Sequence, residues 1–386
     1  MGRPLRVGLY SPYFGSTIGG GEKYLCRTAA LIRDRFPDAR VEIVSPVPAD
    51  RERNERMLGV DLSGIELVAT NRRVTSIHRF LNSVALLRPL RDRFLARQAD
   101  RFTARYDVYL PLAFAIRLAP RRGPGAILCQ FPYPYPGSEL DGYSEIVCYS
   151  EYVRGWVREY WDREATVVHP PVEVPAAEPA WGLKERIVLS VGRFFATAHS
   201  KRQDVMVEAF KALCDAGLSG WELHLAGGVH RDAEHAGYYR RVLAAAAGYP
   251  IHVHADVAPK ELEDLYARAS LYWHAAGYGT PEDPATAEHF GMTTVEAMAR
   301  GAVPIVFGRG GQVEVVTSGR DGFLWTSLAE LQERTRRLAA DAGLRQELAR
   351  AARESSRRFS PERFEASMLA ALEPVMTAAL AEPARA

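Results

Sequence analysis

The sequence predicts an α/β protein built from two doubly wound parallel sheets, one in each half of the chain. Its 386 residues are more than one hydrophobic core of ordinary size organises, and they fit two domains. Both halves open with an apolar run, a loop and a helical pattern, at 5–36 and again at 186–216. Prolines at positions 170, 171, 175 and 179 interrupt regular structure between the halves.

The domain bounds follow from these observations. We expect a first Rossmann-like domain at 1–170, a second at 171–364, and a final helix with a tail at 365–386. Parallel sheets of this kind bind ligands at the carboxyl ends of their strands. The functional residues are therefore expected in the loops that follow the strands.

Composition narrows the class of protein. With 47% hydrophobic and 25% charged residues and a formal net charge of +2, the chain reads as a globular protein without the charge excess of a nucleic-acid binder. No apolar run approaches the roughly 18–20 residues that span a bilayer, and the first residues lack a signal-peptide pattern. We expect a cytoplasmic protein whose four scattered cysteines are reduced: Cys26, Cys129, Cys148 and Cys214.

A glycine-rich loop follows the first strand of the N-terminal half. The strand is expected at 5–10 and the helix at 23–36, with Gly19-Gly20-Gly21-Glu22 between them. Glycines there would let the backbone close on a ligand at the edge of the sheet. Three glycines alone are also typical of a flexible turn, and they do not form the GxGxxG pattern. Further strands are expected at 41–47, 108–112, 126–129 and 146–149, with a helix at 151–161.

The segment 72–105 is rich in arginine. It holds nine arginines and two aspartates, and its apolar residues recur every three or four positions, as on one helical face. Such a face could meet anionic lipid headgroups or a lipid-phosphate acceptor. A solvated arginine-rich surface would have the same pattern, so both interpretations stay open.

The C-terminal half repeats the strand, loop and helix order. A strand at 186–191 ends at Gly192-Arg193, Lys201 follows in the loop, and a helix is expected at 203–216. Both basic side chains could neutralise a diphosphate, although such residues are often simply solvated. Further elements are expected in order: strands 221–227 and 251–255, a helix at 259–269, strands 271–275 and 303–307, and a helical tail at 328–380. The loop 276–288 is rich in Gly, Pro, Asp and Glu, and we expect it to be mobile.

The stretch from Glu288 to Gly301 carries the strongest functional signal. Two acids, Glu288 and Glu296, flank Phe290-Gly291-Met292 and the start of an apolar helical run. We expect Thr293 or Thr294 to cap this helix and Gly301 to end it. A helix start offers free N–H groups to a phosphate, and a glycine lets an anion approach the backbone. The two carboxylates could then hold hydroxyl groups on either side of a diphosphate.

This stretch resembles the retaining glycosyltransferases of family 4. The shared features are Glu-x7-Glu with Phe-Gly after the first acid, and Gly310-Gly311-Gln312-Val313-Glu314 after the next strand. The resemblance implies the GT-B architecture, in which two Rossmann-like domains face across a cleft and a C-terminal helix crosses back to the first domain. Among its branches, the chain is most similar to the alpha-1,2-mannosyltransferases, which share the Gly-Gly-Gly-Glu opening and Glu-His-Phe-Gly.

The resemblance also implies roles for individual residues. Catalysis would rest on Glu288, which orients the sugar, and on Arg193 and Lys201, which stabilise the leaving diphosphate without a metal ion. Binding of the donor would involve Gly20, Gly21, Val257, Phe290, Gly291, Met292, Thr293 and Glu296. The sugar and acceptor would lie near Gln130 and Ser150. The family usually has a histidine where Gln130 stands, so an amide replaces a group that could carry charge.

The implied activity is transfer of a sugar, with retained configuration, from a UDP- or GDP-sugar to an acceptor hydroxyl that could be lipid-linked. No cofactor and no nucleic acid are expected, and peripheral contact with the inner face of a membrane could occur through 72–105. Two alternatives remain: a non-catalytic nucleotide-sugar-binding protein, and a sugar-nucleotide epimerase on the same architecture.

Metal chemistry has little support in the sequence. His252 and His254 share one face of a strand, but no third ligand stands at a metal-like spacing along the chain. Neither HExxH nor Asp-x-Asp occurs. We therefore predict no metal site and take these histidines as packed or surface residues.

Overall fold

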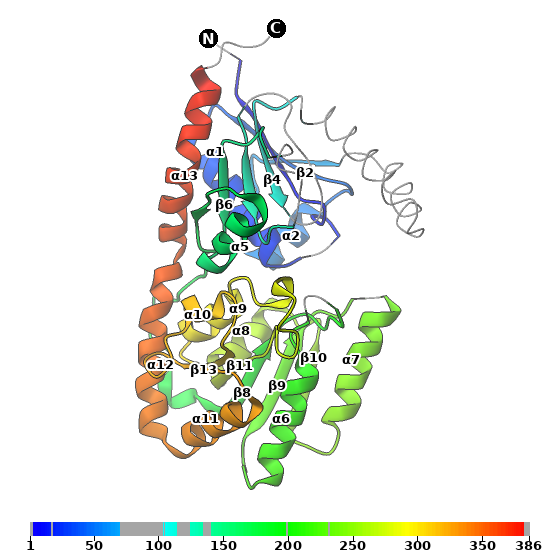
Figure 1. Cartoon of the computed structure of the whole chain (residues 1–386), viewed down its shortest axis with the longest axis vertical. Coiled ribbons are helices and arrows are strands. Elements are labelled where there is room, and N and C mark those ends of the chain that lie inside the picture. Colours follow the sequence, from blue (N-terminus) through cyan, green and yellow to red (C-terminus); the bar gives the residue numbers. More distant parts are fainter. Residues whose placement is uncertain are drawn as a thin grey trace. The chain divides into compact units, whose positions relative to one another are not determined.

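The computed structural model describes most of the chain: residues 3–16, 18–69, 103, 105–113, 124–133, 140–197, 200–230 and 232–381. The chain forms two compact units (Figure 1). Unit 1 comprises Met1–Pro170 together with Glu362–Ala386, and unit 2 comprises Pro171–Pro361. Apart from positions 103 and 105, the arginine-rich segment 72–105 lies outside the described residues, so the hypothesis of a lipid-binding face there stays a prediction.

Unit 1 is built on a seven-stranded sheet with the order β3-β2-β1-β4-β5-β6-β7. Its strands, paired in parallel, are β1 (Arg6–Tyr10), β2 (Arg40–Ser45), β3 (Glu66–Ala69), β4 (Val108–Ala113), β5 (Ala126–Cys129), β6 (Glu145–Cys148) and β7 (Thr166–Val167). The described helices are α1 (Gly20–Arg35), α2 (Arg51–Leu58), α5 (Glu151–Trp161) and α13 (Pro361–Ala381). In this unit α13 packs beside α1, where the rings of Tyr24 and Phe364 meet edge to face at 5.3 Å between centroids (Figure 1).

Unit 2 is built on a six-stranded sheet with the order β10-β9-β8-β11-β12-β13. The strands are β8 (Glu185–Val191), β9 (Glu222–Gly227), β10 (Ile251–Ala255), β11 (Ala269–His274), β12 (Val303–Phe307) and β13 (Phe323–Trp325), and every pairing is parallel. The helices are α6 (Gln203–Asp215), α7 (Ala233–Ala246), α8 (Pro259–Arg268), α9 (Met292–Ala299), α10 (Gln312–Val315), α11 (Leu328–Ala340) and α12 (Ala342–Ser356).

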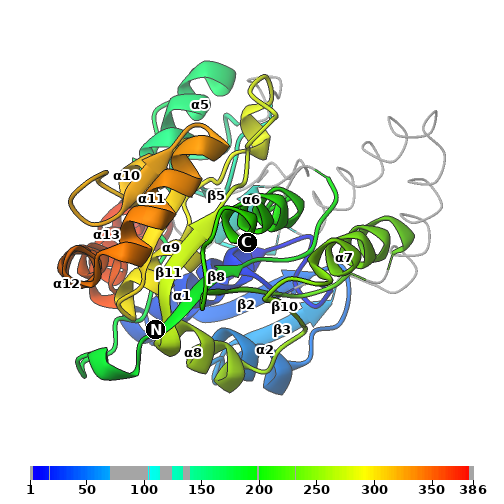
Figure 2. The same ribbon diagram turned by 90° about the horizontal axis from the view of Figure 1, so that it is seen from below.

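Helices cover both faces of the unit 2 sheet. Contacts place α6, α7 and α11 on one face and α8, α9 and α12 on the other, and Figure 2 shows α6 and α8 on opposite sides. A large apolar core lies under the first group and includes Leu223, Leu225 and Trp273. Two doubly wound parallel sheets confirm the predicted fold class.

Six strands and α-helices of the described structure were not predicted from the sequence: α2, β3, β7, α7, α10 and β13. The helix α2 is highly charged, so it lacks the apolar stripe that marks a helix, although Asp50 caps its first turn and Gly59 ends it with φ 63°. Strand β13 has only three residues, too few for a recognisable alternation. Short or polar elements such as these depend on their neighbours more than on their own pattern.

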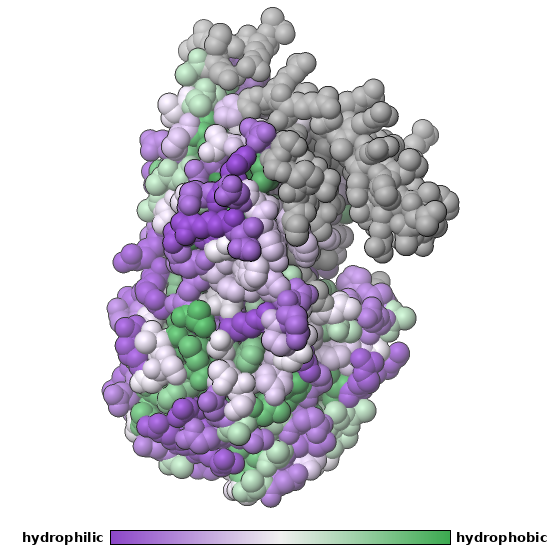
Figure 3. Space-filling model, viewed as in Figure 1, coloured by the Kyte–Doolittle hydropathy of each residue, from purple (hydrophilic) through white to green (hydrophobic). Residues whose placement is uncertain are grey.

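One helical stretch within the expected helical tail is more apolar than the sequence analysis indicated. Among the described residues, Ala342–Ala381 is long enough to cross a membrane, with a mean hydropathy of 1.3 over its most apolar window. Within it, α13 buries Phe364, Met368 and Leu372 at helical spacing, and the surface along α13 mixes hydrophilic and hydrophobic residues (Figure 3). That pattern is typical of an amphipathic helix packed on its own unit.

The side chain of Lys184 binds the ends of two helices of unit 2, and we expect it to stabilise the fold. Its Nζ donates to the carbonyl oxygens of Ala269 at 2.8 Å, Arg300 at 2.6 Å and Tyr266 at 3.4 Å, at the carboxyl ends of α8 and α9. Lys184→Met leaves these acceptors without their hydrogen-bond donor, so we expect the free energy of unfolding to fall by about 3 kcal/mol. Urea unfolding measures this free energy, with Lys260→Met at an exposed position as the control. An equal loss of stability in both variants would show that Lys184 does not stabilise the ends of α8 and α9.

Candidate functional site

Residues predicted to bind a donor gather at the carboxyl edge of the unit 2 sheet. Arg193 lies two residues beyond β8, Glu288 lies in the loop between β11 and α9, and Lys201 lies two residues before α6. Parallel strands bring these loops to one edge although the residues are up to 95 positions apart in the chain.

Glu288 is the centre of a charged cluster. Its Oε2 accepts a hydrogen bond from Lys201 Nζ at 2.5 Å and lies 2.9 Å from Nε2 of His274, the last residue of β11. The Glu288 side chain is 15% exposed, and that of Lys201 is 23% exposed. A carboxylate held from two sides keeps one fixed orientation, as a group that aligns a sugar ring must.

The protonation states of this cluster follow from its contacts. Burial alone would raise the pKa of Glu288, but Lys201 and His274 together hold it well below its ordinary value. Burial lowers the pKa of His274, against the opposing effect of the Glu288 carboxylate. At neutral pH the Glu288 carboxyl group is therefore ionised and the His274 imidazole is neutral.

Glycines let the loops after β8 and β9 pack against each other. A Cβ on Gly192 would lie 2.5 Å from Cγ of Lys201, and one on Gly227 would lie 2.0 Å from the carbonyl oxygen of Gly192. Lys201 thus lies over the residue that precedes Arg193, whose guanidinium stacks on the Phe195 ring at 4.4 Å. The two basic residues are brought to the same part of the edge.

The cap of helix α9 lies two residues before Thr293, the first of the two expected caps. Its N-cap is Gly291, with φ 112° and ψ 48°, so the prediction of a threonine cap is wrong. Thr294 is buried and its Oγ1 accepts from Gln312 Nε2 at 2.9 Å, so it packs inside rather than capping. A positive φ favours glycine, and a Cβ here would also lie 2.8 Å from that Gln312 amide nitrogen. The helix ends as expected at Gly301, which follows its last turn with φ 79°.

Gly310 and Gly311 hold the backbone of the Glu288 loop. The N–H of Gly311 donates to the carbonyl oxygen of Glu288 at 2.7 Å. A Cβ on Gly310 would lie 2.2 Å from that oxygen, and one on Gly311 would lie 2.5 Å from Cα of Phe290. Phe290 is buried against Phe359, with ring centroids 5.1 Å apart. The glycine pair is therefore required by close packing behind the site.

Other predicted donor residues lie on α9 and beside it. Glu296 accepts from Tyr266 Oη at 2.9 Å, and Thr293 Oγ1 accepts from Tyr272 Oη at 2.7 Å. Met292 is the first helical residue and is partly buried. Val257, also partly buried, follows Asp256, whose Oδ1 accepts from the Val229 N–H at 3.1 Å. Their roles toward a ligand stay predictions.

The remaining predicted residues belong to unit 1. Gly20 and Gly21 open α1, and a Cβ on Gly21 would lie 1.8 Å from Nε2 of Gln130, so the Gln130 amide packs on the start of this helix. Ser150 is fully buried, and its Oγ caps α5 by accepting from the Val153 N–H at 3.2 Å. Helix capping accounts for this serine. The expected contact of Gly20 and Gly21 with the donor, and the expected nearness of Gln130 and Ser150 to the sugar and acceptor, stay predictions.

Sequence reasoning missed His274 and the tyrosines that support the acids. A polar residue at the carboxyl end of a fully buried strand is a usable signal for His274. Tyr266 and Tyr272 are buried, and only their hydroxyl groups distinguish them from core aromatics. The pattern of a strand or helix cannot show which neighbour such a hydroxyl meets.

Arg309, two residues after β12, binds the loop 276–288, which we expected to be mobile. The Arg309 guanidinium donates to the carbonyl oxygens of Gly277 at 3.2 Å, Thr280 at 2.7 Å, Pro281 at 3.0 Å and Asp283 at 3.1 Å. Four bonds from one side chain restrict the loop that delivers Glu288.

His289 makes the stability of the site depend on pH. Burial lowers its pKa from 6.5 to about 4. The unfolded chain therefore takes up a proton below pH 6.5 that the folded protein excludes, so stability is lost as pH falls from about 6.5 to about 4. We expect His289→Gln to reduce this loss by on the order of 2 kcal/mol. Urea unfolding at pH 7.5 and 4.5 measures this loss of stability, and His230→Gln at an exposed histidine is the control. If His289→Gln loses as much stability as the wild type and this control, burial of His289 is not the cause of the pH dependence.

The sequence of unit 2 matches a described family. Residues 175–355 match glycosyl transferases group 1. Over 241 residues, the chain is 25% identical to a GDP-Man:Man(3)GlcNAc(2)-PP-Dol alpha-1,2-mannosyltransferase of Dictyostelium discoideum, covering 58% of this chain and 46% of that protein. Over 145 residues it is 29% identical to a mannosylfructose-phosphate synthase of Agrobacterium fabrum, covering 36% of this chain and 29% of that protein.

The fold is similar to that of solved proteins. The crystal structure of Anabaena HepE in complex with UDP and glucose matches with a TM-score of 0.68 and 15% identity, over 96% of this chain and 99% of that one. At this identity the likeness shows the fold alone. The matches to the two curated relatives span less than half of those proteins' length.

Proposed function

We propose that the protein is a hexosyltransferase, because its residues 175–355 match the group 1 glycosyl transferases. It moves a sugar from a nucleotide donor to an acceptor hydroxyl with retained configuration. The observation that carries this proposal is the Lys201–Glu288–His274 cluster at the sheet edge that also holds Arg193 and the start of α9.

Each group has a role in the proposed reaction. As the bond to the anomeric carbon breaks, that carbon gains positive charge while negative charge grows on the diphosphate. Arg193, Lys201 and the N–H groups at the start of α9 stabilise the growing negative charge. Glu288, held by Lys201 and His274, orients the sugar through its hydroxyls. Two fixed cations supply the charge that a divalent ion would otherwise supply, so the reaction proceeds without one.

Glu296 and Val257 would bind the nucleoside. The Glu296 carboxylate, positioned by Tyr266, accepts hydrogen bonds from the ribose hydroxyls. Val257 lies in the loop after β10, where backbone groups meet the base and discriminate weakly between bases. GDP-mannose is the first donor candidate, since a relative is named for GDP-mannose, and a UDP-hexose is the second.

The phosphate of the departing nucleoside diphosphate takes up the proton of the acceptor hydroxyl, which attacks on the same face of the sugar. The acceptor class follows the relatives' names: a lipid-linked saccharide or a phosphorylated sugar. A lipid-linked acceptor would place the protein at the inner face of a membrane, with 72–105 as the contact.

Nucleotide release tests the proposal. Purified protein is incubated with UDP- and GDP-sugars, with and without polyprenyl-linked sugars or phosphorylated hexoses, and with magnesium and manganese omitted. We expect release that depends on the acceptor, and an α-linked product by NMR from an α-linked donor. Binding without turnover would indicate a non-catalytic binder, and an epimerised donor without acceptor would indicate an epimerase. A strict need for either metal would contradict the role given to Arg193 and Lys201.

A further inference from the structure

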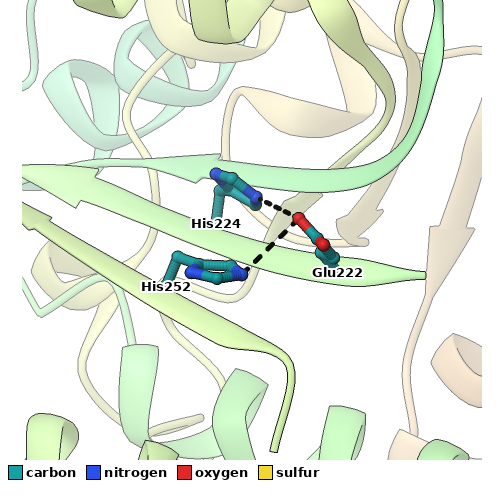
Figure 4. A group of neighbouring side chains, drawn as sticks. All are labelled: Glu222, His224 and His252. Atoms are coloured by element: carbon teal, nitrogen blue, oxygen red, sulfur yellow. Dashed lines mark hydrogen bonds and ion pairs between the residues drawn. The ribbon is translucent and has the colours of Figure 1, made fainter. Parts of the chain in front are cut away.

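Three side chains with metal-binding atoms meet on strands β9 and β10, outside the candidate site. The strands pair in parallel with His224 opposite His252. Leu223 and Leu225 point into the apolar core, so Glu222 and His224 lie on the other face of the sheet. Figure 4 shows Glu222, His224 and His252 converging on one point.

No third ligand accompanies the β10 histidines at a metal-like spacing along the chain, but folding brings two further metal-binding side chains beside His252. The ligating atoms of Glu222, His224 and His252 all lie within 4.8 Å of one another. The additional ligands come from the neighbouring strand, about 30 residues earlier in the chain. Spacing along one strand cannot show them.

The distances suit a tetrahedral ion. Ligands that lie about 2.1 Å from a tetrahedral zinc are separated from one another by about 3.4 Å. Glu222 Oε2 lies 3.1 Å from His224 Nε2 and 3.5 Å from His252 Nε2. These two pairs of donor atoms are thus close to the spacing that zinc requires, and the donor atoms of His224 and His252 lie within 4.8 Å of each other.

A second layer of contacts orients His224. Its Nδ1, the nitrogen turned away from Glu222, lies 3.1 Å from Nε2 of His254. The Nδ1 of His254 in turn lies 3.9 Å from Oε1 of Glu261 on α8. A ligating histidine usually has such a partner on its other nitrogen, which fixes the ring and its tautomer.

We propose that Glu222, His224 and His252 form a zinc site that ties the edge strand β10 to β9. Two imidazoles and one carboxylate are ligands that zinc accepts, whereas magnesium and calcium prefer oxygen alone. The side chains of Glu222 and His252 are 49% and 48% exposed, so the ion can enter from solvent, and water can take its fourth position.

The zinc site is separate from the proposed transfer reaction. Glu222 is the first residue of β9 and His252 the second of β10, whereas Arg193 follows the carboxyl end of β8. Because the strands are parallel, the zinc site lies toward the amino ends of the sheet. Its role is to hold an edge strand whose outer side has no neighbour in the described sheet. Zinc binding can therefore be tested without an assay of sugar transfer.

Calorimetric titration with zinc chloride tests the site in the full chain after treatment with EDTA and desalting. We expect wild-type protein to bind zinc, and His252→Ala or Glu222→Gln to weaken binding at least about tenfold. Saturating zinc should also raise the Tm of the wild type more than that of either variant. Both substitutions are at half-exposed positions, so the variants should fold.

Two matched variants guard against nonspecific effects. Glu185→Gln makes the same change at a side chain of 48% exposure on the adjacent strand β8, and His230→Gln removes an exposed histidine elsewhere in unit 2. Both should bind zinc as the wild type does. Absence of zinc binding by the wild type, or equal affinity in His252→Ala and Glu222→Gln, would overturn the proposal. So would a loss of binding in either control as large as in those variants.

Discussion

Glu288→Gln is expected to lower the rate of sugar transfer about 100-fold or more, while the protein stays folded. The amide has the size of the carboxylate but no charge, so it cannot hold Lys201 and His274 as the carboxylate does. It also presents a donor where the sugar hydroxyls need an acceptor. The measurement is kcat with the best donor and acceptor of the nucleotide panel, with circular dichroism to verify folding.

A double-mutant cycle separates the catalytic role of Glu288 from its structural one. Glu288→Gln leaves the Lys201 ammonium group without its partner, which lowers stability. In the Lys201→Met background that cost should shrink, whereas the rate of transfer should not recover. The exposed Glu282→Gln in the same loop should behave as the wild type. A rate within severalfold of the wild type in folded Glu288→Gln would refute the role of this carboxylate.

Arg193→Ala is expected to lower kcat about 100- to 1000-fold, because it removes a fixed positive charge from the leaving diphosphate. The guanidinium stacks on Phe195, so it is positioned before any ligand binds. Arg193→Lys keeps the charge but loses the planar fork, and its rate should fall between those of Arg193→Ala and the wild type.

The control for Arg193 is Arg240→Ala on the exposed face of α7, which should leave kcat unchanged. Binding of the free nucleoside diphosphate, measured by calorimetry, should also weaken in Arg193→Ala. If nucleotide affinity and kcat both match the wild type, the diphosphate does not lie beside Arg193, and the proposed donor site is wrong.

Much of the fold could be predicted because local pattern and tertiary structure agree. Strands at 126–129, 251–255 and 303–307 have the predicted bounds, since fully or half-buried strands show as apolar runs between turn residues. The helix at 151–161 was also correct, with Ser150 as its cap. These elements are specified by residues that are adjacent in the chain.

The contacts of Glu288 could not be predicted in the same way. The acid was identified from its place before Phe290-Gly291, but His274 was not, because it reaches Glu288 only after β11 and the loop 276–288 have folded. The cap of α9 was misassigned for a related reason. A threonine is the better cap in isolation, but Thr294 is buried and accepts a hydrogen bond from Gln312, the first residue of α10.

By itself, the sequence determined the α/β class, the order of most elements, and the residue types that a sugar-diphosphate site requires, because each depends on local pattern and spacing. Only the tertiary structure decided which polar side chains meet: His274 with Glu288, the Gly310–Gly311 pair with the Glu288 backbone, and His224 with His252 across two strands. Parallel pairing brings together residues that are tens of positions apart, and the register that aligns them is set by packing of the whole sheet.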